Sequence, residues 1–168
     1  MDCYTSLAGG YDSLTEDVQY EKRAAFLQKL LAKSTIPVHT VLDLACGTGT
    51  MTCLLAEAGY EMIGVDLSED MLSEAAGKTV SPGKIPPIYL QQSMEELDLY
   101  GTVEAAVCCL DSINYLTDAR ALKRALQRLH LFVAPGGVFL FDVNTPCKLR
   151  SLDGQVFLDE REDLYCVW

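Results

Sequence analysis

The sequence predicts an α/β fold with a doubly wound, mostly parallel sheet. Short apolar segments alternate with segments of helical periodicity along most of the chain, and a glycine-rich turn follows the first apolar segment. Strands that are separated by helices require right-handed crossover connections, which place the strands parallel in one sheet. With 168 residues, of which 49% are hydrophobic and 22% are charged, the chain is long enough to bury the core of one domain.

The first third of the chain predicts a helix, a strand and a second helix. Apolar residues recur at helical spacing over residues 17–33, which indicates an amphipathic helix. Residues 40–45 form a short apolar run that only Asp43 interrupts, as expected of a buried strand. After the glycine-rich turn, a helix over residues 50–58 should end at Gly59.

The middle of the chain repeats the strand–helix pattern. Residues 61–67 predict a second strand. Ser68 is a suitable N-cap for a helix over residues 69–76, and Gly77 is a suitable residue to end it. Residues 81–87 contain three of the six prolines, which predicts a loop.

The second half of the chain predicts three further strands. Residues 88–92 and 105–110 are predicted strands, and the apolar composition of the second segment indicates burial on both faces. A helix over residues 118–133 carries an apolar side, and a sharp turn at residues 134–137 leads into a strand over residues 138–143.

Composition and charge exclude several classes of protein. The 13 basic and 24 acidic residues leave a net charge of −11, which argues against a protein built to bind nucleic acid. No apolar run reaches the roughly 18 residues of a membrane span, and no secretory signal is visible. The seven cysteines are scattered among apolar residues without metal-binding spacing, so we expect reduced thiols, no metal site and a cytoplasmic protein.

The candidate ligand site lies where the first two strands end. In open α/β sheets, ligands bind at the carboxyl ends of the strands. A turn with two glycines, Gly47 and Gly49, follows the first strand, and Asp66 ends the second, where it can accept hydrogen bonds from two ribose hydroxyls. This combination predicts a site for a cofactor that contains a nucleoside.

The same turn distinguishes between cofactor classes. A dinucleotide fingerprint requires a third glycine, where this sequence has Thr52, and the chain has no Gly-Lys-Ser/Thr triplet of a P-loop. Asp43 would repel a pyrophosphate, whereas it suits a ligand with an ammonium and a sulfonium centre. An oxidoreductase dependent on NAD(P) is therefore the least favoured alternative.

These motifs resemble those of class I S-adenosylmethionine-dependent methyltransferases, of the bacterial small-molecule type. The sequence V-L-D-L-A-C-G-T-G-T at residues 41–50 is similar to the first motif of that family, and G-V-D-L-S-E-D-M-L at residues 64–72 is similar to its acidic motif. Residues 107–116 and 131–144 are similar to later core motifs, and the opening Tyr11-Asp12 also fits. The resemblance implies a Rossmann-like core and S-adenosylmethionine as the cofactor.

The resemblance also implies how the chain is divided. Residues 1–35 are expected to form a helical segment that covers the cofactor site, and residues 36–144 to form the cofactor-binding core. The family sheet has seven strands that end in an antiparallel hairpin, whereas only five strands can be placed here. Residues 145–168 are then either the start of a substrate-side element or a truncated tail, in which residues 155–158 and 164–168 are candidate short strands.

Site residues follow from the resemblance position by position. Gly47 and Gly49 would make room for the methionine part of the cofactor, near whose ammonium group the Ala45 backbone and the Asp43 carboxylate lie. Asp66 would hold the ribose. The remaining implied contacts are Leu67 and Met71 beside the adenine, Leu110 and Asp111 near the transferred methyl group, and Tyr11 closing over the cofactor.

One position departs from the family pattern. Ser93 stands where an aspartate commonly accepts a hydrogen bond from the adenine amino group, so either the Ser93 hydroxyl or the Met94 backbone would make that contact. The loss of a charged acceptor should weaken binding by about 1 kcal/mol.

The sequence thus predicts methyl transfer to a small molecule or another acceptor that is not a nucleic acid. No residue can be assigned as a catalytic base, and the acceptor is not identified. The alternative is an incomplete or non-catalytic cofactor-binding module, a fragment of a longer methyltransferase. Without a closing hairpin, the strand over residues 138–143 would be an apolar edge that favours self-association.

Overall fold

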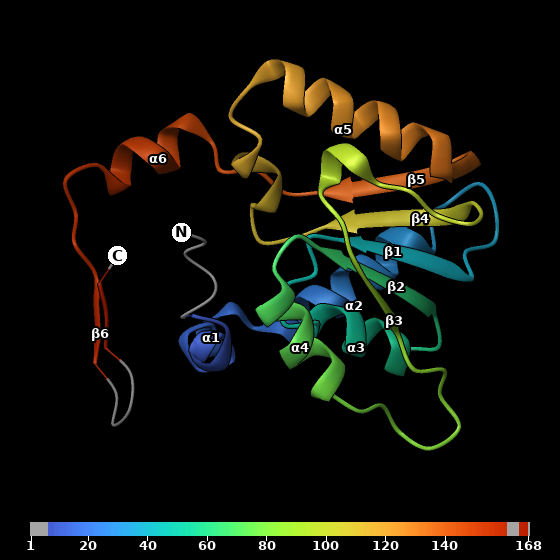
Figure 1. The fold of residues 1–168 in the computed structure, drawn as a ribbon, viewed down its shortest axis with the longest axis horizontal. Coiled ribbons are helices and arrows are strands. Elements are labelled where there is room, and N and C mark those ends of the chain that lie inside the picture. The colour runs from blue at the N-terminus through green and yellow to red at the C-terminus, as the bar shows by residue number, and fades with distance from the viewer. Residues whose placement is uncertain (1–6, 161–164, 168) are drawn as a thin grey trace.

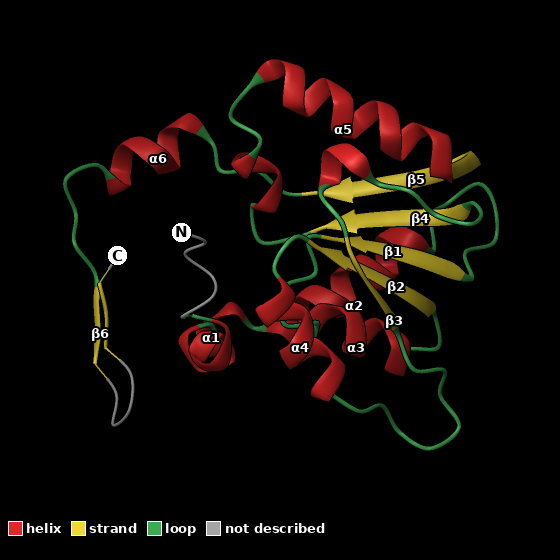
Figure 2. Cartoon of the chain, in the orientation of Figure 1, coloured by secondary structure: helices red, strands yellow, loops and turns green. Residues whose placement is uncertain are grey.

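The fold is a parallel sheet with helices on both faces. A computed structural model describes residues 7–160 and 165–167 (Figures 1 and 2). Five parallel strands lie in the order β3-β2-β1-β4-β5, which confirms the doubly wound topology. The strands are β1 (Thr40–Leu44), β2 (Glu61–Asp66), β3 (Ile88–Gln91), β4 (Val103–Cys108) and β5 (Val133–Phe141).

The core lies on the two faces of this sheet. The helices are α1 (Ala8–Leu14), α2 (Tyr20–Leu31), α3 (Thr50–Glu57), α4 (Glu69–Gly77), α5 (Ala119–Phe132) and α6 (Pro146–Leu152). Alternate residues of β1 point to opposite faces. Val41 packs with α2 and α3, whereas Leu42 belongs to the cluster that includes Leu129 of α5. Figure 1 accordingly shows α5 on one side of the sheet and α2 and α3 on the other.

Local signals account for where some of the helices begin. The Ser68 hydroxyl accepts a hydrogen bond from the Met71 N–H at 3.3 Å, so the predicted N-cap of α4 is confirmed. The first long helix begins later than residue 17, because Gln19 is left-handed and separates α2 from the 3₁₀ turn Glu16–Val18. Helix α1 was not a separate element of the prediction.

Strand β5 begins earlier than predicted. We expected residues 134–137 to form a turn before the strand, but β5 starts at Val133 and includes them. Its pairing with β4 steps from Val133 opposite Val103 to Val138 opposite Ala105, so the glycine-rich segment bulges out of the ladder. A Cβ on Gly137 would lie 2.5 Å from the Glu104 carbonyl oxygen, which explains the glycine there.

The chain after the sheet contains one helix and one small hairpin. Thr145 caps α6 by accepting from the Lys148 N–H at 3.3 Å, a signal that the sequence prediction did not use. Strands β6 (Leu158–Glu160) and β7 (Tyr165–Val167) pair antiparallel in a separate sheet. The first candidate strand therefore lies slightly later than predicted, and residues 164 and 168 of the second are outside the described residues.

Two further points concern the surface of the described residues. Among the five strands of the main sheet, β5 is an edge, with Phe141 exposed at its end. Self-association through this edge stays a prediction. No helix in residues 7–160 combines the length and the apolar character that crossing a membrane would require.

Candidate cofactor site

A pocket of about 420 Å³ lies at the carboxyl ends of the strands. It is enclosed by the segments that follow β1, β2, β3 and β4, and by Tyr11 of α1. Ten of the twelve predicted site residues line it: Tyr11, Asp43, Ala45, Gly47, Asp66, Leu67, Met71, Ser93, Met94 and Leu110. Gly49 and Asp111 are adjacent in sequence to lining residues but do not line the pocket.

The turn after β1 is built from left-handed backbone. Ala45, Gly47 and Gly49 have φ angles of +62°, +54° and +72°. An added Cβ on Gly47 would meet no atom within 4 Å, so Gly47 leaves open space at the pocket wall. On Gly49 a Cβ would instead lie 2.6 Å from the Tyr89 hydroxyl oxygen and 2.9 Å from the Ala75 Cβ. Glycine is therefore required at position 49 for two reasons: the left-handed backbone of the turn, and the close packing of the turn against Tyr89 and Ala75.

We expect substitution of Gly47 and of Gly49 to lower the stability of the protein by different amounts. Gly49→Ala should lower the free energy of unfolding by about 3 kcal/mol, because left-handed strain and a steric clash both act. Gly47→Ala should cost only about 1 kcal/mol, since the strain acts alone. Urea unfolding of both variants measures the difference, and equal losses would contradict the packing role of Gly49.

Asp66 joins the ends of β1 and β2. Its Oδ2 accepts from the Gly47 N–H at 2.7 Å, and its Oδ1 accepts from the Ser68 N–H at 2.9 Å. Each carboxylate oxygen has a further lone pair, and the side chain lines the pocket. The carboxylate is thus oriented by two backbone donors and retains acceptor capacity for two hydroxyl groups.

Asp43 lies beneath the same turn and is 2% exposed. The Thr52 hydroxyl donates to its Oδ2 at 2.6 Å. Burial, with a smaller contribution from the charge of Asp66, raises the pKa of Asp43 to about 6, although the Thr52 hydrogen bond opposes the shift. Thr52 replaces the third glycine of a dinucleotide fingerprint, and its hydroxyl here satisfies this carboxylate.

A second left-handed turn follows β4. Leu110 and Asp111 have φ angles of +57° and +53°, which is uncommon for residues other than glycine. Leu110 lines the pocket, whereas Asp111 contacts the segment after β5. The Asp111 N–H donates to Asp142 Oδ1 at 3.2 Å, and the Asn144 amide donates to Asp111 Oδ2. Asp111 therefore holds the loop that carries Leu110.

The segment after β3 lines the far end of the pocket. Ser93 lines it as predicted, and the Ser93 hydroxyl donates to Glu96 Oε2 at 3.1 Å, which leaves the hydroxyl oxygen able to accept. Glu95 also lines the pocket and pairs with Arg124 of α5. A carboxylate is thus present on this wall at Glu95, two residues after Ser93, which stands where the family commonly has an aspartate.

The remaining predicted residues differ in exposure. Met71 is 2% exposed and packs within α4, whereas Leu67 is 65% exposed at the pocket rim. Burial raises the pKa of the Tyr11 hydroxyl well above its usual range, so this group stays protonated at neutral pH. Leu67 and Met71 both contribute to the pocket lining, and their side chains are apolar.

Several lining residues were missed by sequence reasoning. Tyr20 was interpreted only as part of the apolar side of a helix, yet its ring lines the pocket. Thr48 and Thr50 lie between and beside the two glycines, where polar side chains next to a ligand turn are a usable signal. Tyr115 and Cys109 flank the turn after β4, and no local pattern marked them.

The charges of the pocket wall have one sign. Asp43, Asp66 and Glu95 line it, whereas no lysine, arginine or histidine does so among the described residues. Within residues 7–160 and 165–167, no group of three or more histidine, cysteine or acidic side chains is arranged to hold a metal ion. Such a wall favours a ligand that carries positive charge.

Together the fold and the site define a Rossmann-like protein with a pocket at its topological switch point, which is where open α/β sheets bind their ligands. Residues 41–137 match the model of the methyltransferase domain family. The chain therefore belongs to the class I S-adenosylmethionine-dependent methyltransferases, and the resemblance seen in the sequence is confirmed.

Similar proteins include both sequences and solved structures. The chain is 35% identical over 167 residues to the putative methyltransferase YqeM of Bacillus subtilis, a match that covers 98% of this chain and 65% of that protein. An S-adenosylmethionine-dependent methyltransferase structure from Clostridium acetobutylicum is 34% identical with a TM-score of 0.83, and the match covers 99% of this chain and 68% of that one. A dTDP-3-amino-3,6-dideoxy-α-D-glucopyranose N,N-dimethyltransferase of Streptomyces fradiae is 31% identical over 73% of this chain and 46% of its own length. The chain thus spans about two thirds of the first two proteins.

Proposed function

We propose that the pocket binds S-adenosylmethionine and that the chain transfers its methyl group to a small-molecule acceptor. The observation that carries this proposal is the acidic wall formed by Asp43 and Asp66, since no lysine, arginine or histidine of the described residues lines the pocket and the third acidic lining residue, Glu95, is already paired with Arg124. S-adenosylmethionine carries a sulfonium, an ammonium and one carboxylate, so its net charge is positive, whereas a pyrophosphate would be repelled. The open space beside Gly47 also fits a ligand that approaches the backbone closely.

Each wall of the pocket has a part in this proposal. Asp66 accepts from the ribose hydroxyls, and Asp43 stabilises the ammonium group from beneath the turn. Leu67 and Met71 flank the adenine, while Ser93 or the Met94 backbone contacts its polar edge. Leu110 and Tyr11 face the methyl group.

The chemistry places few demands on acid–base residues. Bound S-adenosylmethionine supplies a methyl group on a sulfonium that is already a good leaving group. The protein aligns the acceptor heteroatom with that methyl and excludes water. When the methyl moves, the acceptor gains the carbon, the sulfur keeps the electron pair of the broken bond, and a proton on the acceptor passes to solvent or a nearby base. The acceptor is proposed to be a small molecule because the amino-sugar methyltransferase named above acts on one.

Ligand binding tests the cofactor part of the proposal. S-adenosylhomocysteine at 100 times its Kd should stabilise the protein by about 2.7 kcal/mol, which is a rise in Tm of several degrees. NADH at the same concentration should produce no shift. A shift with NADH and none with S-adenosylhomocysteine would overturn the proposal.

The second candidate is a module that binds the cofactor without turnover. The observation that favours it is that the two carboxylates at the glycine turn are engaged within the fold: Asp43 is 2% exposed and accepts from the Thr52 hydroxyl, and Asp66 accepts from two backbone N–H groups. A methyl-transfer assay with amine and hydroxyl acceptors distinguishes the two. Cofactor binding without product, alongside turnover by a relative such as the Bacillus protein, would favour the module.

A further inference from the structure

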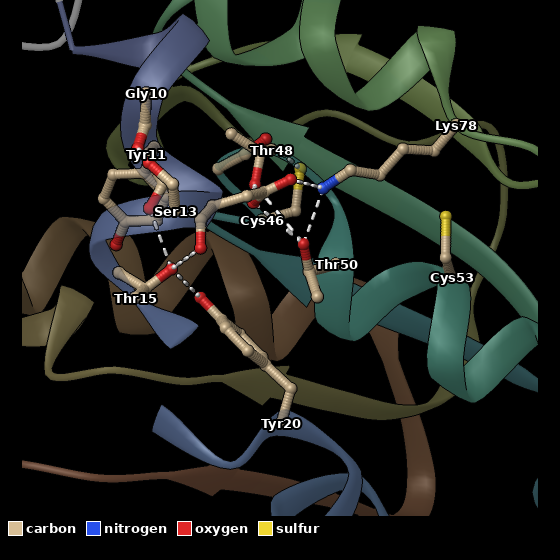
Figure 3. Close-up of polar contacts among 12 residues, drawn as sticks. Gly10, Tyr11, Ser13, Thr15, Tyr20, Cys46, Thr48, Thr50, Cys53 and Lys78 are labelled. Atoms are coloured by element: carbon tan, nitrogen blue, oxygen red, sulfur yellow. Dashed lines mark hydrogen bonds and ion pairs between the residues drawn. The ribbon is translucent and has the colours of Figure 1, made fainter. Parts of the chain in front are cut away.

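Helix α1 is joined to the pocket wall by a cluster of four polar side chains, Asp12, Thr48, Thr50 and Lys78. Asp12 Oδ1 accepts from the Thr48 hydroxyl at 2.5 Å and from the Thr50 hydroxyl at 3.0 Å. Asp12 Oδ2 lies 2.5 Å from Lys78 Nζ, which also donates to the Thr50 oxygen at 2.6 Å. Figure 3 shows Lys78 reaching from the end of α4 toward Thr50 and Thr48.

This cluster connects three segments that enclose the pocket. Asp12 follows Tyr11, which lines the pocket, and Thr48 and Thr50 are lining residues of the turn after β1. Lys78 ends α4, the helix that carries Met71. The helix that places Tyr11 in the pocket is therefore held against the same turn that would hold the cofactor.

The cluster is charged at neutral pH. Burial alone would raise the pKa of Asp12, but hydrogen bonds from Lys78 and Thr48 outweigh that effect and hold the pKa below its usual range. The Lys78 side chain is 26% exposed and that of Asp12 is 48% exposed, so the pair is partly shielded from solvent. Such an ion pair contributes more to stability than a fully exposed one. The Asp12 carboxylate is also fixed in position, because it accepts from three groups.

A second contact holds the C-terminal end of α1, about one turn after Asp12. The Thr15 hydroxyl donates to the Tyr11 carbonyl at 2.9 Å and accepts from the Tyr20 hydroxyl at 3.3 Å. Because Tyr20 begins α2, Thr15 joins α1 to that helix, whereas Asp12 joins α1 to the turn after β1 and to Lys78. Helix α1 is therefore held at two places.

We infer that Asp12 and Lys78 are positioning residues that fasten α1 over the cofactor pocket, and that cofactor release requires this fastening to open. The inference rests on the proposed cofactor site, but neither side chain lines the pocket. Removing either one should speed cofactor dissociation and loosen α1, while the sheet keeps its stability.

The test uses Asp12→Ala, Lys78→Met and the double variant, with S-adenosylhomocysteine as the probe. Each single variant should release the probe about tenfold faster in surface plasmon resonance, and the double variant should be no faster than the singles, because the two side chains act as one unit. Lys78→Arg keeps the charge and should restore nearly normal release. Lys29→Met and Asp153→Asn, which alter exposed charges elsewhere, are the matched controls.

Hydrogen exchange separates this role from a general effect on folding. In ligand-free protein, amides of residues 8–14 should exchange faster in both single variants, whereas amides of β1 and β4 should not. Unchanged exchange over residues 8–14, or additive effects on release in the double variant, would overturn the inference. If the wild-type chain bound no S-adenosylhomocysteine, the cofactor proposal would fail, while the exchange measurement would still decide whether Asp12 and Lys78 fasten α1.

Discussion

Replacing Asp66 by alanine should weaken the binding of S-adenosylmethionine and S-adenosylhomocysteine by roughly 100-fold or more. Two charge-assisted hydrogen bonds to the ribose hydroxyls would be lost, each worth about 1.5–3 kcal/mol. Both carboxylate oxygens already accept one backbone N–H, from Gly47 and Ser68, so the carboxylate cannot rotate away from the pocket. Isothermal titration calorimetry measures the change in Kd directly.

Controls distinguish ribose binding from a general effect of the Asp66 substitution. Glu69→Ala removes an exposed acidic residue three positions later and should leave the affinity unchanged. A cofactor analogue without the ribose 2′-hydroxyl should bind the wild-type protein more weakly, whereas Asp66→Ala should distinguish the two ligands far less. A Kd for Asp66→Ala within threefold of wild type would exclude the ribose assignment.

The sequence predicted the sheet and the location of the pocket because their determinants are local. The strands are apolar runs, Ser68 caps α4 through its own hydroxyl, and Asp66 and the glycine turn lie at strand ends. Parallel topology then brings those strand ends to one edge without further information. This is why most predicted site residues line a single pocket.

The features that sequence reasoning missed depend on contacts between distant segments. Asp12 and Lys78 meet only because α1 and α4 lie side by side, and nothing near either residue indicates the other. Gly49 could be assigned a left-handed turn from its position, but its packing against Tyr89 requires the sheet. The bulge in β5 likewise reflects its register against β4.

Cofactor affinity should depend on pH through Asp43, and it should fall about tenfold from pH 7 to pH 5. The pKa of Asp43 is about 6 in the ligand-free protein, so the carboxylate is mostly charged at pH 7 and mostly protonated at pH 5. The ammonium group of the cofactor, with an ordinary pKa near 8, stays charged throughout this interval. Protonation of Asp43 therefore removes an attraction without changing the ligand.

Asp43→Asn isolates this effect. The variant keeps an oxygen that can accept from Thr52, whose hydroxyl donates to Asp43 Oδ2 in the wild-type protein. Its affinity should be low at pH 7 and nearly independent of pH down to 5. Calorimetry at several pH values gives the difference between the two proteins, and a wild-type Kd that is flat over this range would contradict a role for Asp43 in binding.

The contribution of Asp43 to the stability of the ligand-free protein should change with pH in the opposite direction. The pKa of Asp43 rises from 3.8 to about 6 on folding, so the folded state binds more protons than the unfolded state between these values. The contribution of this group is therefore most favourable below pH 4 and declines by about 3 kcal/mol as the pH rises to 6 and above. Urea unfolding across this range should show the decline as a change in the free energy of unfolding of the wild type relative to Asp43→Asn, because the other titrating groups are common to both proteins. Cofactor binding would then strengthen with rising pH while the contribution of Asp43 to folding stability weakens. That combination would show that burial of the charged Asp43 destabilises the ligand-free protein and that the same charge stabilises the bound cofactor.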